Sequence, residues 1–493
     1  MRFSRLLLPV LLFVALAAKG AVYTFDYNEK CRQAYMHYMS LQFEQGRAVV
    51  MQAMKENPYN LMPTFISDYE DCLLLLFNGD KKDLQQMKGH MDLRLGLLSK
   101  AEKNTPWYRF SKAGIYMHWA LVHLRFSDNF KAAGAFRKSY LLLKENKKLY
   151  PSFAYNDVYL GLAETVVGVI PDEYKWIAAI FGMKGSVKKG IGKLDHFIET
   201  NAADALMRQE AVVYDLYMRF YLLHDQEYVW KYLNSSRFVT KDNLLQQFVY
   251  ANIAINYRKA AQAIDVLKAA ERNKYHDRYP IFDYEMGSAL LNKTDPASIA
   301  YLRSFVENFR GNIFIKDAWQ KLFQAYLLED NIDAAMECKK GIMTHGTLMV
   351  DADKQAQRFA ESNDMPDKRL LAARLLVDGG YYNEALGILG RQDEADFANI
   401  TSKLEYNFRM GRIHEELGKD AQALSFYSNT VAAGKNRKEY FAARALLQSA
   451  FIYEKKGDRW QALNKYKECL ELKGHDFQNS IDQMAKAGID RLQ

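Results

Sequence analysis

Proline, glycine and cysteine are all scarce in this chain. It contains nine prolines and 27 glycines in 493 residues, below the roughly 5% and 7% of an average protein. No run of β-branched residues alternates with polar ones, so the pattern of a β-strand is missing as well. The four cysteines are too few for a disulfide scaffold. Ala, Leu, Lys, Glu, Gln and Met, which favour helices, are abundant instead. The composition therefore predicts an all-α protein.

The first 20 residues are organised like a secretory signal peptide. Arg2 and Arg5 precede an apolar stretch from Leu6 to Leu16, and small residues follow. This stretch is too short to cross a hydrocarbon layer of about 30 Å as a helix, so we expect cleavage after residue 20 rather than an uncleaved anchor. The prediction is an exported protein, in the periplasm or at the periplasmic face of the outer membrane of a Gram-negative bacterium, where it could associate peripherally with that membrane.

Length and charge limit the protein further. A chain of 493 residues exceeds the roughly 100–200 residues of one domain, so it contains several domains or a series of repeats. The three basic residues of the leader, once removed, lower the net charge from +8 to +5. So small an excess does not favour nucleic acid as a partner. We expect no nucleic-acid partner and no transmembrane span.

The cysteines leave one pairing open. Cys31 and Cys72 lie in neighbouring helical segments near the N-terminus, so they either form a disulfide in the exported protein or remain buried thiols. Cys338 and Cys469 lie more than three of the repeats described below apart, on the order of 25 Å. Since a disulfide needs Cα atoms within about 7 Å, these two match poorly.

Three segments of the C-terminal third share one spacing. Each has a glycine, four further residues and an Ala-Leu pair, and the glycines are Gly380, Gly418 and Gly457. Another small residue stands twelve positions before each alanine, and a leucine or tyrosine stands four positions after it. These sets are Ala373, Ala385 and Leu389, then Gly411, Ala423 and Tyr427, then Ala450, Ala462 and Tyr466. The period is 38 to 39 residues.

This spacing has a physical meaning. Small residues on two successive helices let the helices approach closely, the glycine takes the positive φ that ends a helix, and the later ring fills the space beyond the alanine. One such hairpin cannot bury its apolar face alone, so hairpins must stack. With these residues the chain resembles the tetratricopeptide repeat family, whose unit of 34 residues is a helix–turn–helix. The resemblance implies an all-α superhelical solenoid of antiparallel helix pairs.

Weaker copies of the pattern lie upstream. One copy lacks the turn glycine and consists of Trp319, Leu322, Phe323, Tyr326 and Ala335. The pairs Gly287 with Ile299 and Ala251 with Ala263 keep the spacing of twelve, and residues 107–124 with 129–143 form a plausible hairpin. We therefore divide the chain into a leader (1–20), an N-terminal helical region of degenerate repeats (21–200), further degenerate repeats (201–310) and C-terminal repeats (311–493).

Residues 155–194 combine glycine, proline and aromatic residues in a distinct order. The run includes Leu160-Gly161-Leu162, Val169-Ile170-Pro171, Tyr174-Lys175-Trp176, Phe181-Gly182-Met183-Lys184-Gly185 and Gly190. It resembles, weakly, the tetratricopeptide branch that includes proteins involved in clearing inclusion bodies in eukaryotic cells. The resemblance implies a helical connector with two sharp turns rather than a catalytic site. Those relatives are intracellular, so we do not transfer their biology to a chain with an export leader.

The search for catalytic motifs gives one near match. His414-Glu415-Glu416 begins like the zinc-protease helix, but the position of the second histidine is Gly418, and one imidazole cannot hold catalytic zinc. We expect His414 to be a core residue. His118 and His123 are about 140° apart around a helix and do not converge. No nucleophile elbow, paired cysteine motif or dinucleotide fingerprint occurs in the sequence. We therefore predict no enzymatic activity, no metal and no cofactor.

A partner-binding surface follows from the resemblance. In the family, positions two, five, nine and twelve of each first helix line the concave groove, one helical face opposite the buried residues. The candidate partner-binding residues at such positions are Arg374, Phe408, Arg412, Glu415, Phe451 and Glu454. Aromatic anchors flanked by Arg and Glu suit a protein or peptide segment with both apolar and charged groups. The alternative is that the charges form a solvated face and the Phe rings pack between repeats.

The function predicted from these features is an exported, non-enzymatic scaffold or adaptor that binds a protein or peptide partner in the bacterial cell envelope. The family's lysine and asparagine that clamp a C-terminal carboxylate are replaced here, for example by Phe408 and Arg412, so we expect that specificity to be absent. The alternative is an envelope glycan- or lipid-associated helical binding protein that uses the N-terminal half, because 32 tyrosines offer rings that can stack on sugars.

Overall fold

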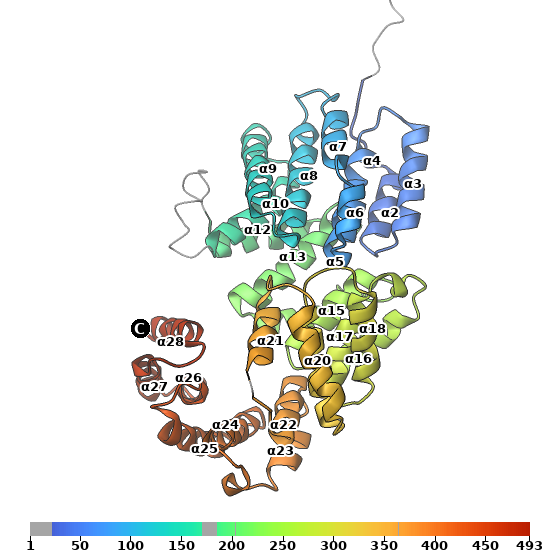
Figure 1. The fold of residues 1–493 in the computed structure, drawn as a ribbon. Coiled ribbons are helices and arrows are strands. Elements are labelled where there is room, and N and C mark those ends of the chain that lie inside the picture. Colours follow the sequence, from blue (N-terminus) through green and yellow to red (C-terminus); the bar gives the residue numbers. More distant parts are fainter. Residues whose placement is uncertain (1–21, 170–184, 203, 363) are drawn as a thin grey trace, which may run out of the picture. The chain divides into compact units, whose positions relative to one another are not determined.

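The computed structural model describes residues 22–169, 185–202, 204–362 and 364–493. Within these ranges the regular structure is helical, with one β-bridge between Thr24 and Asn60 (Figure 1). The helices pack in consecutive antiparallel pairs, which confirms the predicted fold class. The predicted leader lies outside the described residues, as do residues 170–184 of the predicted connector. No helix in the described ranges is both long and apolar enough to cross a membrane.

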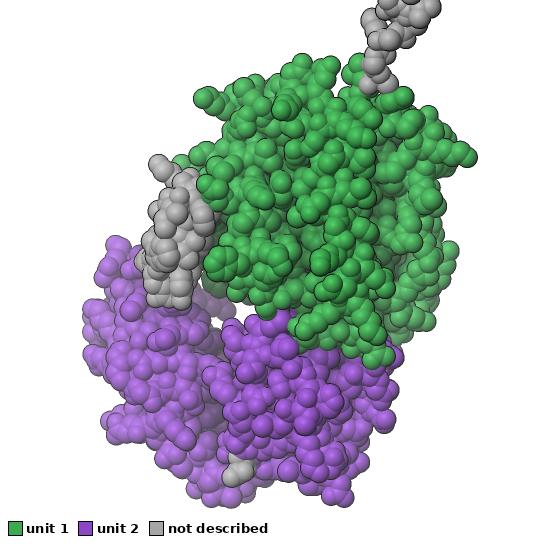
Figure 2. All heavy atoms as spheres, turned by 45° about the horizontal axis from the view of Figure 1, so that its top comes forward, with its two compact units in different colours: residues 1–250, 269–281, 309–312 green, residues 251–268, 282–308, 313–493 purple. Residues whose placement is uncertain are grey.

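The chain forms two compact units (Figure 2). Unit 1 comprises residues 1–250, 269–281 and 309–312, and unit 2 comprises residues 251–268, 282–308 and 313–493. The dividing lines run through α15 (Leu244–Asn256), α16 (Ala260–Glu271) and α17 (Ile281–Leu291). The segment bounds expected at residues 200 and 310 stay a prediction.

The remaining helices follow in chain order. Unit 1 contains α2 (Glu29–Tyr38), α3 (Phe43–Glu56), α4 (Met62–Ile66), α5 (Asp68–Asn78), α6 (Lys81–Gln86), α7 (His90–Leu98), α8 (Pro106–Arg125), α9 (Asn129–Leu149), α10 (Asn156–Gly168), α12 (Val187–Thr200), α13 (Arg208–Met218) and α14 (Gln226–Leu233). Unit 2 contains α18 (Ser298–Asn308), α19 (Ile315–Leu328), α20 (Ile332–Thr344), α21 (Asp351–Glu361), α22 (Lys368–Gly379), α23 (Tyr382–Leu389), α24 (Ile400–Glu416), α25 (Asp420–Gly434), α26 (Phe441–Lys455), α27 (Arg459–Glu471) and α28 (Gln478–Leu492).

The three predicted turn glycines end their helices as expected. Gly380, Gly418 and Gly457 have φ angles of 87°, 72° and 77°. In each turn the amide that follows the glycine donates to the carbonyl five residues earlier, at 2.8–2.9 Å, and the glycine amide donates to the carbonyl three residues earlier. These two bonds define a Schellman motif, which satisfies carbonyls that the helix end leaves without partners.

Upstream hairpins use the same turn without glycine. Arg258, Thr294 and Asp330 have φ angles of 58°, 58° and 57°, and the following amides again donate five residues back, at 2.8–2.9 Å. These residues stand 36 positions apart. Asp330 therefore occupies the place of the turn glycine missing from the copy at 319–335. The repeat continues upstream in structure where its most visible residue in the sequence is absent.

The small and aromatic residues of the repeats form the predicted close contacts. Ala423 and Tyr427 on α25 are both 0% exposed. A Cβ on Gly411 of α24 would overlap the ring of Tyr427. Gly411 therefore packs closest to the Tyr427 ring and not to Ala423. Ala462 and Tyr466 on α27 are buried in the same way against α26. In the α24–α25 hairpin the repeat spacing thus places a ring where the opposing helix has a glycine.

Two features of unit 1 bear on the sequence predictions. The hairpin expected from residues 107–143 is formed by α8 and α9. In the predicted connector, α10 crosses α12 where Gly161 faces Gly190, because a Cβ on Gly161 would lie 2.7 Å from the Gly190 carbonyl oxygen. The glycines of that signature therefore serve a close crossing of two helices.

All four cysteines are free and buried. The Sγ of Cys31 lies 3.5 Å from the carbonyl oxygen of Asp26, and the Sγ of Cys72 lies 3.9 Å from that of His118. Of the two alternatives for Cys31 and Cys72, the structure shows the buried thiols. Burial raises the pKa of the Cys31 thiol to about 11, so its reactive thiolate is scarce at neutral pH.

Candidate partner-binding site

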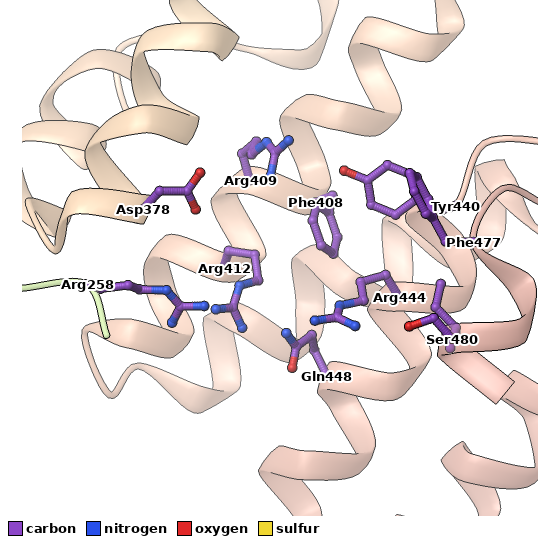
Figure 3. Close-up of a pocket in the computed structure, with 11 residues that line it drawn as sticks. Arg258, Asp378, Phe408, Arg409, Arg412, Tyr440, Arg444, Gln448, Phe477 and Ser480 are labelled. Atoms are coloured by element: carbon purple, nitrogen blue, oxygen red, sulfur yellow. The ribbon is translucent and has the colours of Figure 1, made fainter. Parts of the chain in front are cut away.

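Unit 2 contains a pocket of about 320 Å³ beside the first helices of two stacked hairpins, α24 and α26 (Figure 3). The turn after α15, the end of α22 and the start of α28 complete its walls. The lining residues are Arg258, Asp378, Phe408, Arg409, Arg412, Tyr440, Arg444, Gln448, Phe477, Ser480 and Ile481. The pocket therefore combines four guanidinium groups, one carboxylate and an aromatic rim.

Three of the four arginines have carboxylate partners. On α24, Arg412 donates to Glu415 Oε2 at 2.8 Å and to Glu416 Oε1 at 2.7 Å. Arg258 also pairs with Glu416. These ion pairs link the turn after α15 to α24 and fix two guanidinium groups at the pocket wall. Because their partners stand three and four residues along the same helix from Arg412, the sequence supports the arrangement locally.

Arg409 is held in a similar way. It stands one position after Phe408, and it donates to Glu405 Oε1 through Nε at 3.1 Å and Nη2 at 2.9 Å. Both partners lie on α24, one helical turn apart. The contact uses one edge of the guanidinium group, whose two N–H groups share one carboxylate oxygen, and it leaves the positive charge locally compensated.

Arg444 on α26 differs from the other three. Its Nη1 donates to the sulfur of Met484 at 3.5 Å, and it forms no ion pair with any described residue. Burial lowers its pKa below the ordinary value, the positive charges of Arg412 and Arg258 lower it further, and the negative charge of Glu415 opposes them in part. Arg444 is thus a half-buried cation beside two other cations, without a negative partner in the described part of unit 2.

The aromatic side chains of the pocket divide into a core part and a rim. Phe408 is 4% exposed and packs against Phe441 and Tyr440, with ring centroids 5.6 and 6.1 Å apart. Phe477, which precedes α28, is 49% exposed and meets Tyr440 edge-on at 5.5 Å. Phe477 therefore offers an apolar surface to a ligand, while Phe408 contributes mainly to the packing between α24 and α26.

The structure brings two of the six candidate residues into the pocket, Phe408 and Arg412 (Figure 3). Glu415 lies behind Arg412 as its ion-pair partner and also accepts a hydrogen bond from the Tyr427 hydroxyl at 2.5 Å. Arg374 lies half-buried on α22 and is not among the lining residues. The role of these residues as partner contacts stays a prediction.

The other two candidates lie in the packing between α26, α27 and α28. Phe451 packs on Tyr466, with ring centroids 5.9 Å apart, in a core cluster of these helices. Glu454 accepts hydrogen bonds from the Tyr466 hydroxyl and from Arg491 Nη2, the latter at 3.0 Å. Both side chains therefore have intramolecular partners, as the alternative of inter-repeat packing describes.

Several pocket residues carried no sequence signal. Arg258 belongs to a turn that lacks the family glycine, and Phe477 and Ser480 begin a helix beyond the last recognised repeat. Asp378 stands near the end of α22, outside the four groove positions. Tyr440 precedes α26. Their convergence depends on how hairpins far apart in the sequence stack, which no local pattern reports.

His414 and His118 lie in packed surroundings. His414 stacks on Phe426 with ring centroids 5.5 Å apart and planes 9° apart, and burial lowers its pKa. No group of three or more metal-ligating side chains occurs in the described ranges. In unit 1, His118 Nδ1 lies 2.9 Å from Asp68 Oδ2 and its Nε2 lies 2.8 Å from the Tyr159 hydroxyl.

A buried carboxyl group lies in the same core of unit 1. Glu210 accepts a hydrogen bond from the Tyr69 hydroxyl at 3.0 Å, and burial raises its pKa to about 7. Glu210 is 5% exposed, Tyr69 is 2% exposed and His118 is 1% exposed. Side chains so thoroughly covered are positioned for packing and not for meeting a ligand from solution.

Comparison with known proteins gives only distant structural similarities. No protein-family model and no curated protein sequence matches the chain. The apo form of the quorum sensor NprR from B. thuringiensis is similar at 14% identity over 82% of this chain and 97% of that one, with a TM-score of 0.28. The APC/C hetero-tetramer Cut9–Hcn1 is similar at 13% identity over 99% of both chains, with a TM-score of 0.28. Naa15/Naa10 bound to HypK is similar at 14% identity over 94% of this chain and 78% of that one, with a TM-score of 0.19. Scores this low support no inference about function.

Proposed function

We propose that the chain is an exported, non-enzymatic, tetratricopeptide-like scaffold that binds a protein or peptide segment at the pocket of unit 2. The observation that carries this proposal is that one pocket beside stacked hairpins is lined both by an exposed aromatic ring, Phe477, and by Arg444, whose guanidinium forms no ion pair with a described residue. Aromatic and arginine side chains dominate binding energy at protein interfaces. Stacked helical repeats commonly bind partners on their concave surfaces.

The chemistry of the pocket supports a binding role over catalysis. Guanidinium groups stay protonated in proteins, so the four arginines cannot act as general bases or exchange protons at neutral pH. Asp378 is the one carboxylate among the lining residues, and no histidine or cysteine is among them. The pocket is therefore suited to hold a ligand by charge and shape.

The proposed location rests on the sequence. Two basic residues, a short apolar stretch and small residues at the N-terminus have the order of a secretory leader. We place the mature protein in the envelope of a Gram-negative bacterium for this reason. Fractionation of cells that express the full chain, with N-terminal sequencing of the product, tests both the export and the cleavage after residue 20.

A photo-crosslinking experiment tests partner binding. Ser480 is exposed at the pocket rim, so a benzoyl-phenylalanine introduced there faces any bound segment. The matched control carries the same group at Lys467, which is exposed on α27 and is not among the lining residues. We expect the Ser480 variant to crosslink a specific envelope protein in cells and the Lys467 variant not to do so. Identical patterns from both variants, or no product from either, would contradict the proposal.

One observation favours the lipid-associated alternative as a second candidate. On α9 of unit 1, Phe130 is 95% exposed and Leu141 is 41% exposed. Arg137 and Lys148 lie on the same line along this helix, because spacings of seven, eleven and eighteen residues return to one face. A basic helical face with exposed apolar side chains suits an anionic membrane surface. Sedimentation with phosphatidylglycerol vesicles, lost in Phe130→Ala and retained in Met51→Ala, would support this candidate; no sedimentation of the unmodified chain would remove it.

A further inference from the structure

We propose that the segment bound in the pocket of unit 2 is acidic, with one of its carboxylates on Arg444 and an adjoining apolar side chain against Phe477. This inference rests on the proposed function, because it names the chemistry of the partner at the same site. It makes Arg444 the specificity-determining residue of the pocket. The ligand class is a peptide segment in which a carboxylate adjoins an apolar side chain.

The charge arrangement provides the first argument. Arg412, Arg258 and Arg409 each form an ion pair with a glutamate, whereas Arg444 forms none with any residue in the described part of unit 2. A half-buried cation without a partner is costly, because burial removes hydration that no opposite charge replaces. A bound carboxylate would restore that compensation. Arginine suits this task because its planar fork can donate two parallel hydrogen bonds to one carboxylate.

The surroundings of Arg444 provide the second argument. Arg412 and Arg258 lie on the same wall of the pocket and disfavour the charged form of Arg444, and Glu415, which is already paired with Arg412, offsets their effect only in part. An anion beside Arg444 would relieve this repulsion as well as forming its own ion pair. Gln448, 5% exposed, adds an amide that can donate to the same ligand.

The pocket also discriminates between anions. Asp378 belongs to its lining, so a ligand with a high negative charge meets repulsion there. One uncompensated guanidinium matches the single charge of a carboxylate better than the nearly double charge of a phosphate. The rings of Phe477 and Tyr440 extend the site with apolar surface that a free ion would leave uncovered. These features favour a peptide carboxylate over inorganic phosphate.

The experiment is a calorimetric titration of the full mature chain with two capped peptides. The first is acetyl-Gln-Phe-Glu-Leu-Gln-amide, which carries one carboxylate, and the second has Gln in place of that Glu. We expect the acidic peptide to bind at least tenfold more tightly than the neutral one. Arg444→Gln should reduce the affinity for the acidic peptide at least tenfold, and Arg444→Lys should reduce it less, because the charge remains and the fork is lost.

The matched control is Arg459→Gln. Arg459 is an exposed arginine on α27 whose Nη2 donates to the Gln493 carbonyl oxygen at 3.2 Å, away from the pocket lining. The Arg459→Gln variant changes the net charge by the same amount as Arg444→Gln. Its affinity for the acidic peptide should equal that of the unmodified chain. Circular dichroism of all variants checks that they remain folded. If Arg444→Gln unfolds, the affinities of Arg444→Lys and Arg459→Gln for the acidic peptide are compared instead. A weaker affinity in Arg444→Lys supports the inference, and equal affinities contradict it.

Three outcomes would overturn the inference. They are equal affinities of the two peptides, equal affinities of the Arg444 and Arg459 variants, and heat from inorganic phosphate without binding of the acidic peptide. Failure of the proposed function has a different signature. If Ser480 crosslinks a partner but the acidic peptide does not bind, the scaffold role stands and the acidic ligand is wrong. If Ser480 crosslinks nothing, the scaffold role itself fails.

Discussion

Two sets of hairpins in unit 2 end their first helices with the same turn but different residues. From α22 to α27 the residue with positive φ is a glycine, whereas after α15, α17 and α19 it is Arg258, Thr294 or Asp330. The backbone hydrogen bonds are the same in both sets. A residue with a Cβ in this conformation costs roughly 1–2 kcal/mol that glycine avoids. The turn is therefore imposed by the stacking of the helices, and glycine makes it less costly rather than making it possible.

The pKa values of carboxyl groups are shifted in opposite directions in the two sets. In the upstream set, burial raises the pKa of Glu285 to about 7. In the C-terminal set, hydrogen bonds from arginine lower the pKa of Glu454, and lower that of Glu439 to about 2. The upstream hairpins thus contain a carboxyl that favours its neutral form, and the C-terminal hairpins contain carboxylates that favour their charged form. Their stabilities should respond to pH in opposite directions.

The largest expected effect comes from Gly380→Ala. A Cβ there would overlap the carbonyl oxygen of Arg258, which is backbone and cannot move aside alone. Together with the positive φ, this should destabilise the α22–α23 hairpin by about 4 kcal/mol. Hydrogen exchange of residues 368–389, followed by mass spectrometry, measures it.

Gly418→Ala is the control for that experiment. A Cβ at Gly418 meets no atom within 4 Å, so only the backbone conformation is penalised, by roughly 1–2 kcal/mol. Equal protection losses in the two variants would show that the contact between Gly380 and Arg258 does not constrain the turn.

The second prediction concerns pH. Glu285 accepts a hydrogen bond from Asn252 Nδ2 at 2.8 Å, and the charges of Lys321 and Asp317 act on it in opposite directions. The pKa of Glu285 is higher in the folded state than in the unfolded state. Its contribution to the stability of the fold is therefore complete below pH 4.5 and is lost as pH rises through 7. Glu285→Gln keeps the acceptor without the charge. It should therefore stabilise the upstream hairpins at pH 8 by up to about 3 kcal/mol and change little at pH 4.

Glu454→Gln provides the opposite sign. The lowered pKa of Glu454 means that its contribution is present above pH 4.5 and disappears as pH falls further. The variant should match the unmodified chain in acid and be less stable at neutral pH. Hydrogen exchange of α17 and α26, measured during urea unfolding at both pH values, tests the two variants together. If the effects of Glu285→Gln and Glu454→Gln on stability changed with pH in the same direction, the contrast between the two sets of hairpins would be refuted.

The smallest expected effect is a gain from Thr294→Gly. Threonine is β-branched, and such residues rarely adopt positive φ. Removing the side chain should relieve strain and stabilise the α17–α18 hairpin by about 1 kcal/mol, after the greater freedom of glycine in the unfolded chain is subtracted. Thr294→Ala, which keeps the Cβ, should gain less. A loss of stability in Thr294→Gly would mean that the Thr294 side chain itself supports the turn.

The reach of sequence reasoning can be traced along these same hairpins. The spacing of Gly418, Ala423 and Tyr427 predicted the turn, the buried alanine and the buried ring, and the structure has all three. The hairpin around Asp330 was recognised less clearly, because aspartate adopts positive φ far less often than glycine and so does not mark a turn by itself. At the site, Arg412 was predicted from its groove position. Arg444, which we propose as the anchor, is not among the six predicted partner-binding residues, because its lack of an ion pair is not visible in the sequence.

The sequence by itself determined the local structure of this protein, because helix propensity, the twelve-residue spacing of small residues and the turn glycines act over one hairpin. Only the tertiary structure decided which side chains meet. Arg258 and Glu416 are 158 positions apart, and they pair because the hairpins between them stack into one unit. The burial of a side chain likewise arises only when the hairpins stack. Whether an arginine is solvated, paired or left without a partner depends on the dielectric and the charges around it, and for Arg444 both are supplied by residues of other hairpins.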